Sequence, residues 1–394
     1  MYENRTEEKE KMKKLDKARL LEGVGKRIEN DIADFNIAGA RAIVAQGGEI
    51  LLDEVYGYSN ATTREPLKKG AMFRLASLTK PTAGFAFLLG IQKGYFGYND
   101  LLSDHLPKFK NLFVGKVENG RAVPDRPIKN PIRLHMLLSN SSGFTCNSDV
   151  ETVMMEAAPR EAYASRRAYV DYALTGPLGF EPGEGYGYSQ TAAYDVIALL
   201  IEKYSGKPYH EFLSENLFAP LGIKDITFFP TEEQWGRTVA VSDKLFGGRM
   251  ISYDMGRTIF EGYPLEYVAA GAGLLGSAED YFKFAEMLRG RGVYNGVRLV
   301  DDEVFSLYTR HSADIKYRAA GADGTWGLGV YVRVEGARLP IGSFGWSGAY
   351  GTHFFVDPEN DITAIYMKNN RWHDSHGAGK TGANFELDVM AALV

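Results

Sequence analysis

Residues 73–81 read FRLASLTKP, and this stretch contains the strongest functional motif of the chain. Ser77 and Lys80 are three residues apart, so on a helix they share a face and the amine can reach the hydroxyl. A serine hydroxyl becomes an effective nucleophile when a neighbouring base accepts its proton. The start of the same helix also offers N–H groups and a positive dipole end to a negatively charged oxygen. By itself this pair is a weak indication, because serine and lysine also occur together at ordinary helix starts.

Further motifs follow in a fixed order and give the first one its context. Residues 187–190 read GYSQ and open a helical pattern, and residues 344–351 read FGWSGAYG and precede a strand-like stretch. Softer landmarks are IAGA at 37–40, LLSNSSG at 137–143 and FAPLG at 218–222. With these motifs in this order, the chain resembles the serine β-lactamase and penicillin-binding-protein superfamily over about residues 37–367. It is most similar to the class C β-lactamase-like esterases, often called family VIII carboxylesterases.

The resemblance implies a role for each matching residue. Ser77 corresponds to the acylated nucleophile, Lys80 to the group that accepts or relays its proton, and Tyr188 to the general base. A phenol is a poor base at neutral pH unless positive neighbours favour the phenolate. Lys80 and Tyr188 could instead share one proton as a coupled pair, and the sequence leaves this division open. The backbone N–H groups of Ser77 and Ala349 correspond to the oxyanion hole.

The third motif departs from its usual β-lactamase form, Lys-Thr-Gly. Here Trp346-Ser347-Gly348 places an indole where a cation could pair with a lactam carboxylate. Gly348 would let the backbone approach the substrate closely. Gln190 stands where β-lactamases usually have asparagine. We therefore expect Trp346, Ser347, Gly348 and Gln190 to bind a neutral ester or acyl chain in preference to an anionic lactam.

The pattern of strands and helices predicts an α/β (α+β) fold of the β-lactamase type. Its antiparallel sheet would come from both ends of the chain and be flanked by helices, with a mostly helical lobe inserted. We expect residues 1–100 and 231–394 to form the sheet domain and residues 101–230 the helical domain. The expected strands are 40–45, 50–58, 326–334, 352–356 and 361–367, and the expected helices are 77–94, 190–204 and 385–394. An amphipathic helix is expected near the start, with Leu15, Leu20, Leu21, Val24 and Ile28 as its apolar stripe.

Composition excludes several classes of function. The 394 residues include 45 Lys+Arg and 50 Asp+Glu, a net charge of −5, and the absence of a basic patch argues against a nucleic-acid partner. Cys146 is the single cysteine and the histidines lack ligand spacing, so we expect no metal site and no cofactor. The first residues carry no apolar signal stretch, and no apolar run is long enough to insert into a membrane. These features predict a cytoplasmic protein, although a processed secreted form would look the same.

Several other features are weaker. The literal Lys380-Thr381-Gly382 falls after the last predicted strand, so we interpret it as a turn before the final helix. His373 and His376, near Trp372, could lie at the edge of a pocket, but we favour solvated loop residues, and we interpret Cys146 as a packed small hydrophobe. The aromatic stretch 246–267 is equally consistent with an acyl-pocket wall and with ordinary packing. Residues 271–273 (GAG) match a turn that the family places beside the site.

The function that these motifs favour is ester hydrolysis through an acyl-enzyme on Ser77, with a small-molecule ester or acyl compound as substrate. Three alternatives remain open at this stage. The same residues could serve a β-lactamase or D-amino-acid peptidase, or an acyltransferase that passes the acyl group to an alcohol. A binding protein without catalysis would keep the fold alone, but the intact Ser77, Lys80 and Tyr188 argue against it.

Overall fold

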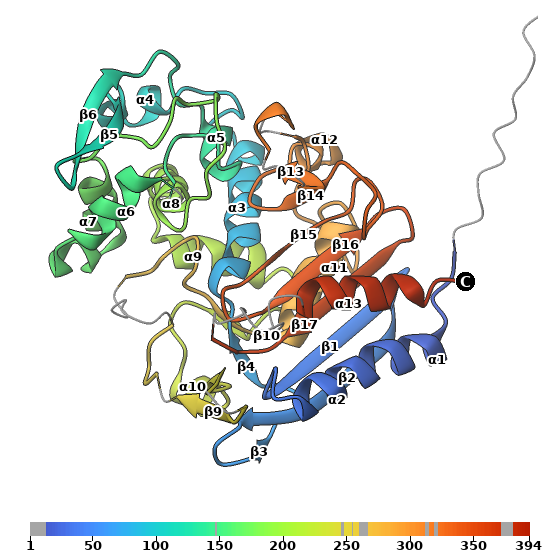
Figure 1. Cartoon of the computed structure of the whole chain (residues 1–394). Coiled ribbons are helices and arrows are strands. Elements are labelled where there is room, and N and C mark those ends of the chain that lie inside the picture. Colours follow the sequence, from blue (N-terminus) through green and yellow to red (C-terminus); the bar gives the residue numbers. More distant parts are fainter. Residues whose placement is uncertain are drawn as a thin grey trace, which may run out of the picture.

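An antiparallel sheet of eight strands joins the two ends of the chain (Figure 1). This computed structural model describes residues 13–145, 148–245, 248–253, 255–259, 267–311, 315–318, 322–371 and 381–394. The sheet order is β13-β14-β15-β16-β17-β1-β2-β3, so early and late strands meet at its centre. The strands are β1 (Gly39–Gln46), β2 (Glu49–Asn60), β3 (Glu65–Pro66), β13 (Gly324–Trp326), β14 (Tyr331–Arg333), β15 (Phe344–Ser347), β16 (His353–Asp357) and β17 (Ile362–Met367).

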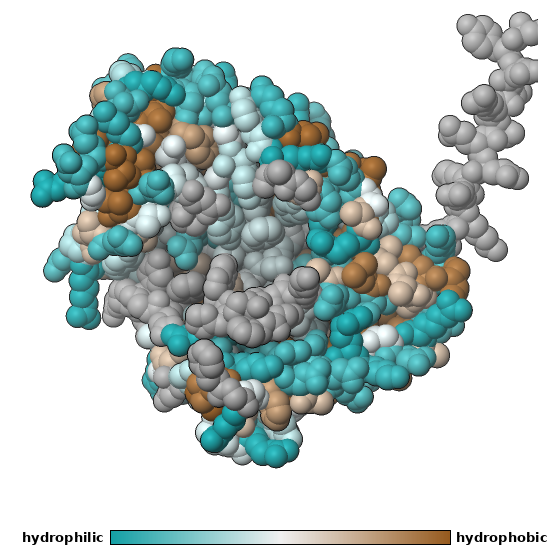
Figure 2. Space-filling model, in the orientation of Figure 1, coloured by the Kyte–Doolittle hydropathy of each residue, from teal (hydrophilic) through white to brown (hydrophobic). Residues whose placement is uncertain are grey.

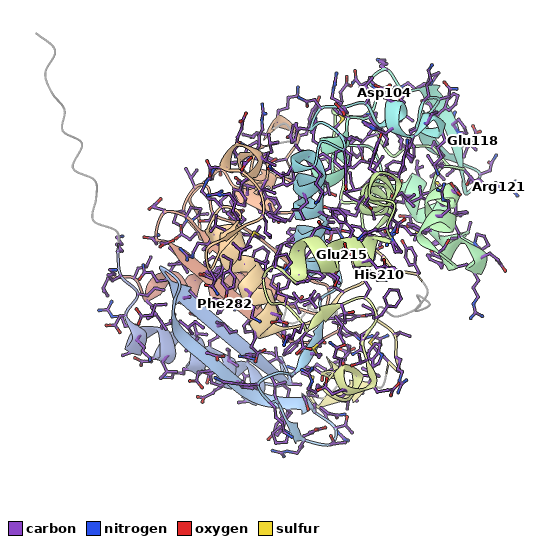
Figure 3. The ribbon with its side chains drawn as sticks, turned by 180° about the vertical axis from the view of Figure 1, so that it is seen from behind. Asp104, Glu118, Arg121, His210, Glu215 and Phe282 are labelled. Atoms are coloured by element: carbon purple, nitrogen blue, oxygen red, sulfur yellow. The ribbon has the colours of Figure 1, made fainter. Side chains whose placement is uncertain are left out.

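The centre of the sheet is buried on both faces. Every residue of β1 is buried, and its register with β17 pairs Arg41 with Met367 and Gln46 with Ile362. One face is covered by α1 (Lys17–Leu20), the π turn η1 (Leu21–Gly25), α2 (Lys26–Ala33) and α13 (Thr381–Ala391). On the opposite face lies α11 (Ala278–Arg289), on which Figure 3 labels Phe282 from behind. The expected sheet built from both ends, with flanking helices, is confirmed.

A mostly helical region occupies the middle of the chain, at the upper left of Figure 1. Its helices are α4 (Leu102–His105), α5 (Leu134–Leu138), α6 (Asp149–Glu156), α7 (Arg166–Ala173), α8 (Ala192–Ser205) and α9 (Tyr209–Leu213). Single 3-10 or π turns, labelled η, complete it: η3 (Pro107–Phe109), η4 (Arg160–Tyr163) and η5 (Ser214–Phe218).

A β-hairpin in this region is absent from the sequence prediction. Strands β5 (Phe113–Glu118) and β6 (Arg121–Pro127) pair around Asn119-Gly120, and Figure 3 labels Glu118 and Arg121 beside the turn. Asn119 has φ 51 and Gly120 has φ 70, the two left-handed residues of a tight hairpin turn. An Asn-Gly pair between strand-forming residues is a strong hairpin signal, and the prolines of β6 obscured it.

The remaining elements surround the start of α3 (Lys80–Gln92). Strand β4 (Met72–Arg74) leads into the 3-10 turn η2 (Ala76–Thr79) and pairs with β10 (Leu275–Ser277), which also pairs with β7 (Ile226–Thr227). The others are α10 (Glu232–Gly236), β8 (Val241–Lys244), β9 (Met250–Tyr253), β11 (Val293–Tyr294), β12 (Val297–Arg298), α12 (Asp302–Ser306) and η6 (Ile315–Tyr317).

Three predicted boundaries are wrong, each for a local reason. The expected strand 326–334 is two strands, because the chain turns between β13 and β14 and Gly329 has φ 74. The expected helix from Ser77 begins with the 3-10 turn η2 and continues as α3. The final helix starts at Thr381 rather than at 385, and thus includes residues read as a turn.

The turn between β13 and β14 packs tightly against α3. A Cβ added to Gly84, on α3, would lie 1.9 Å from the carbonyl oxygen of Leu328. We expect Gly84→Ala to lower the free energy of unfolding by about 1–3 kcal/mol, because the clash with backbone outweighs the gain in helix propensity. Urea unfolding followed by circular dichroism measures this difference.

Gly236, at the end of α10, is the matched control, because an added Cβ would meet nothing within 4 Å. Gly236→Ala should be neutral or slightly stabilising, since alanine restricts the unfolded chain more than glycine does. Equal midpoints for Gly84→Ala and wild type would show that the turn can move away from α3 at little cost.

The surface shown in Figure 2 is mostly hydrophilic, and its apolar residues lie in separate small groups. Scattered exposed apolar residues are normal for folded proteins. Among the described residues, no helix combines the length and the apolar character that crossing a bilayer requires.

Candidate active site

Ser77 lies on a tight turn between β4 and α3. Ala76, fully buried, has φ 47, a left-handed conformation that costs a non-glycine residue on the order of 1 kcal/mol. The next backbone bond runs from the Leu78 N–H to the carbonyl of Leu75, at 3.0 Å. This turn leaves Ser77 partly exposed at the first turn of the helix, where backbone N–H groups lack helical partners.

Lys80 is fully buried below Ser77, and its amine is held by oxygen atoms. Its Nζ lies 3.2 Å from Ser77 Oγ, and it donates to the carbonyl oxygens of Gln190 at 2.7 Å and Gly271 at 3.0 Å. An ammonium has three donors and no acceptor, so these three oxygens suit a charged Lys80. Gly271 comes this close because it lacks a side chain: an added Cβ would lie 2.8 Å from the Gln190 carbonyl oxygen.

Tyr188 joins the same group from the segment that precedes α8. The Lys80 Nζ lies 4.7 Å from the centre of the Tyr188 ring and 4.9 Å from that of Tyr194. Asn140 holds this segment: its side chain accepts from the Ser189 N–H at 3.0 Å, and its carbonyl accepts from the Gly187 N–H at 2.9 Å. Asn140 belongs to the landmark 137–143, so the structure gives that landmark a positioning role.

The third motif packs against the turn that carries Ser77. A Cβ added to Gly348 would lie 2.2 Å from the carbonyl oxygen of Leu75, so this position has no room for a side chain. Thr352 donates to the same carbonyl at 3.0 Å, and Ala349 packs against the small cluster of Ala76, Val241 and Tyr350. Within the described residues, the Ala349 N–H has no acceptor. An N–H available beside Ser77 is what an oxyanion hole requires.

An aromatic wall adjoins Lys80 on the side of the third motif. The rings of Trp346 and Trp326 lie 4.3 Å apart, and the Trp346 ring lies 5.7 Å from that of Tyr188. Trp326 donates its indole N–H to the Tyr186 hydroxyl at 2.9 Å. Such a wall presents apolar ring surface to whatever occupies the site.

A cavity of about 630 Å³ adjoins β15, and Trp346, Gly348 and Ala349 are among the residues that line it. Ser347 faces it from the strand, Lys368 and Arg371 line it from the end of β17, and Thr381 and Gly382 line it from α13. Lys380 lies outside the described residues. The interpretation of residues 381–382 as a turn before the last helix is therefore wrong, since they open α13 and reach the cavity wall.

His353 and Glu386 are functional candidates that the sequence did not reveal. His353 Nδ1 lies 2.8 Å from Ser347 Oγ across the β15–β16 pair, and His353 Nε2 lies 3.3 Å from Glu386 Oε1. Glu386 also binds Arg333 at 2.8 Å and Arg338 at 2.9 Å. Only the facing register of Ser347 and His353 could have indicated this chain of contacts.

Glu386 should make the stability of the protein depend on acidic pH. Burial alone would raise its pKa, but His353, Arg333 and Arg338 together lower it to about 2. A carboxylate with a lowered pKa adds stability that is complete above its unfolded value, near 4.5, and is lost as the pH falls toward 2. This loss should be on the order of 3 kcal/mol.

Urea unfolding at several pH values tests this expectation. In Glu386→Gln the slope of stability against pH between about 4.5 and 2 should be smaller, while stability at neutral pH should already be lower. An unchanged acid slope in this variant would assign the effect to other carboxylates.

The other expected site residues have mixed outcomes. Cys146, Phe246, Phe260, Tyr263, Trp372, His373 and His376 lie outside the described residues. Tyr253 lies on β9, whereas Tyr267 is buried beside the helical region. The turn 271–273 does adjoin the site, through the Gly271 carbonyl. In the described ranges, no group of three or more potential metal ligands is found.

Some of the expected site residues form one group of side chains in contact. Ser77, Lys80, Tyr188 and Trp346 are linked by the distances above, and the Gln190 backbone binds Lys80. Gly348 lies against the Leu75 carbonyl, and Ala349 packs on the cluster that contains Ala76. Ser347 contacts His353, and it lines the cavity together with Trp346, Gly348 and Ala349.

Comparison with known proteins places this arrangement in a family. Residues 24–383 match the Beta-lactamase family. The chain is 25% identical over 390 residues to esterase EstB of Burkholderia gladioli, covering 92% of this chain and 94% of that protein. Among solved structures, EstCE1, a hydrolase with promiscuous acyltransferase activity, superposes with a TM-score of 0.79 at 20% identity, covering 95% and 99% of the two chains.

A family VIII carboxylesterase superposes with a TM-score of 0.72 at 19% identity, covering 95% of this chain and 98% of that one. At these identities the solved structures establish the fold, while the family match spans most of the sequence. The chain therefore belongs to the Beta-lactamase family, within the serine β-lactamase and penicillin-binding-protein superfamily of serine hydrolases.

Proposed function

We propose that the protein hydrolyses carboxylic esters through an acyl-enzyme on Ser77. The observation that carries this proposal is the placement of Ser77 Oγ 3.2 Å from the amine of a fully buried lysine, which two backbone carbonyls hold in place. A buried lysine fixed against a partly exposed serine serves no evident packing purpose. It does provide the proton handling that a serine nucleophile needs.

Proton transfer in this proposal follows from the donors and acceptors around Lys80. Because three oxygens surround its amine, Lys80 acts as an ammonium that donates to Ser77 Oγ. Tyr188, whose ring adjoins the ammonium, then accepts the Ser77 proton as a phenolate. Ser77 Oγ bonds to the carbonyl carbon, and the N–H groups of Ser77 and Ala349 stabilise the oxyanion.

The acyl-enzyme forms when the carbon–oxygen bond to the alcohol breaks and that alcohol takes the proton from Tyr188. Water then attacks the acyl carbonyl, gives its proton to the same Lys80–Tyr188 pair and releases the acid, while Ser77 regains its proton. An alcohol in place of water would give acyl transfer. The names of EstB and EstCE1, an esterase and a hydrolase with acyltransferase activity, support this range of chemistry.

A neutral substrate suits the aromatic wall. Trp346 and Tyr188 are partly exposed and present ring surface where a substrate carboxylate would gain little, and the buried Trp326 packs against Trp346. Among the cations nearby, Arg333 is already paired with Asp323 and Glu386. We therefore favour esters with apolar acyl chains.

One observation favours a second candidate, acyl-enzyme chemistry on an anionic substrate such as a β-lactam or a peptide. Lys368 and Arg371 line the 630 Å³ cavity beside the third motif, and cations there would attract a carboxylate. This candidate uses the same Ser77, so the substrate alone separates it from the ester proposal.

The experiment compares p-nitrophenyl esters of increasing acyl length with nitrocefin, and identifies the reactive serine with a fluorophosphonate probe. We expect rapid ester turnover, slow nitrocefin turnover and a single label on the peptide that contains Ser77. Faster nitrocefin turnover would favour the anionic substrate. A label elsewhere, or no label and no turnover, would contradict the proposal.

A further inference from the structure

Gly271, whose carbonyl binds Lys80, lies in a loop that is pinned on both sides. After it, the Leu274 N–H donates to the Thr79 hydroxyl at 3.1 Å, and the Leu274 carbonyl accepts from the Leu75 N–H at 3.0 Å. The loop therefore joins the turn that carries Ser77 directly. Before Gly271, by contrast, the described contacts of the loop run to the helical region.

Asp195, on α8, makes the first of these contacts. It is fully buried, and its two oxygens accept different loop groups: Oδ1 accepts the Ala270 N–H at 2.8 Å, and Oδ2 accepts the Tyr267 hydroxyl at 2.5 Å. Burial and the neighbouring Asp195 raise the pKa of Tyr267 well above its ordinary value, so its hydroxyl stays protonated and donates. One carboxylate thus fixes the residue immediately before Gly271.

Arg166, on α7, makes the second contact. Its guanidinium donates twice to the Val268 carbonyl, at 2.9 and 3.2 Å, and lies 3.7 Å from Asp195 Oδ1. Glu202 on α8 binds the same guanidinium at 2.5 Å, and the ring of Tyr209 from α9 packs 5.0 Å below it. The charges that face Asp195 are therefore those of Arg166 and Lys80.

The ionised form of Asp195 is energetically unfavourable at this buried position. Burial raises the pKa of Asp195 to about 6, although Arg166, Tyr267, Ala270 and Lys80 all act to lower it. A carboxyl with a raised pKa gives stability at low pH that is lost as the pH rises from about 3.8 through 6. A buried carboxyl whose ionised form is disfavoured in the folded state is more readily explained by function than by stability.

We propose that Asp195 is a positioning residue for Lys80: by holding Tyr267 and Ala270, it presses the Gly271 carbonyl against the amine that serves Ser77. The contact chain runs from Asp195 Oδ1 to Ala270, then through one peptide bond to Gly271, and across 3.0 Å to Lys80 Nζ. Asp195 touches neither Ser77 nor the substrate, so it acts only through this chain. The inference rests on the proposed role of Lys80 in ester hydrolysis.

The test compares Asp195→Ala with Asp195→Asn. Asparagine keeps both contacts, since its oxygen accepts from Ala270 and its amide donates to the Tyr267 oxygen, whereas alanine loses both. We expect kcat for p-nitrophenyl butyrate to fall by about 10- to 100-fold in Asp195→Ala with little change in KM, because the substitution misaligns the Lys80 amine and does not touch the substrate. Asp195→Asn should recover most of this loss. An asparagine variant as slow as the alanine variant would overturn the inference.

Asp280→Ala is the matched control. Asp280, on α11, is also a buried carboxylate that accepts two backbone N–H groups, from Lys224 at 2.6 Å and Asp225 at 2.5 Å. Asp280→Ala should lower the free energy of unfolding, as the loss of a structural aspartate does, yet leave kcat of the folded enzyme unchanged. Equal losses of kcat in Asp280→Ala and Asp195→Ala would show a general effect of destabilisation and overturn the inference.

Tyr267→Phe covers the case in which Asp195→Ala does not fold. It removes one of the two contacts while keeping the ring that packs against Tyr163 and Tyr169. We expect a several-fold lower kcat, and an unchanged kcat would contradict the inference.

The rate of Ser77 labelling by the fluorophosphonate distinguishes the positioning role of Asp195 from the proposed function of Ser77. Slower labelling of Asp195→Ala than of wild type supports the positioning role. Equal labelling of the two proteins would overturn the inference and leave the proposed function intact. Failure of wild type to be labelled at Ser77 would overturn both.

Discussion

Ser77→Ala is expected to lower kcat/KM for p-nitrophenyl butyrate by on the order of 10⁴-fold or more, because the acyl-enzyme cannot form without the hydroxyl. The substitution removes a single oxygen from a partly exposed position, so the fold should persist. The neighbouring Lys80 keeps its two carbonyl acceptors. Initial rates with purified protein and an unfolding curve for each variant measure the effect.

Ser59→Ala supplies the control for this experiment. Ser59 lies on β2, outside the candidate site, and its hydroxyl donates to the Glu65 carbonyl at 3.2 Å. Its loss should leave ester turnover at the wild-type rate. Survival of turnover in Ser77→Ala would mean that another group attacks the ester, and the central motif would have been misinterpreted.

Lys80→Met has the second largest expected effect. Methionine fills a similar volume but lacks the ammonium that favours the Tyr188 phenolate, so the Ser77 proton loses its acceptor and kcat should fall on the order of 10³-fold. The same change leaves the carbonyl oxygens of Gln190 and Gly271 without their buried donor. An unpaired buried acceptor costs about 1–3 kcal/mol, so the free energy of unfolding should also fall.

Lys283→Met separates these two consequences. Lys283, on α11, also donates to a backbone carbonyl, that of Gly222 at 2.8 Å, and to Asp280 at 2.6 Å, but it lies on the surface outside the site. It should show a smaller loss of stability and no loss of kcat. If Lys80→Met were acylated at the wild-type rate, Lys80 would be a structural residue.

The sequence alone was sufficient to predict the features that depend on local patterns and on the order of motifs along the chain. Alternating and apolar strands at both ends of the chain predicted the shared sheet, and the spacing of Ser77 and Lys80 predicted their contact, which lies at 3.2 Å. The motifs predicted that Tyr188 neighbours Lys80 and that the Trp346 segment lines the same site, and the Tyr188 ring lies between the two, 4.7 Å from the Lys80 amine and 5.7 Å from the Trp346 ring. The roles assigned to these residues stay predictions.

What the sequence did not reveal depends on contacts between distant segments. In the sequence, Asp195 is one polar residue among the apolar residues of a helix, and only the fold brings it to Ala270. Glu386 reaches His353 because α13 packs across the sheet, which no local pattern encodes. Thr381 and Gly382 were predicted to form a turn before the final helix, because glycine is typical of turns, whereas they form its first residues.

The central pairing of β1 with β17 has a consequence for synthesis of the chain. The ribosome makes Gly39–Gln46 near the start and Ile362–Met367 near the finish, so β1 emerges long before its neighbour. Until then its backbone N–H and C=O groups form an open edge of the kind that invites intermolecular aggregation. Completion of the sheet is thus a late, long-range event, and a chain interrupted before β17 would leave the buried central strand β1 without one of its two neighbours.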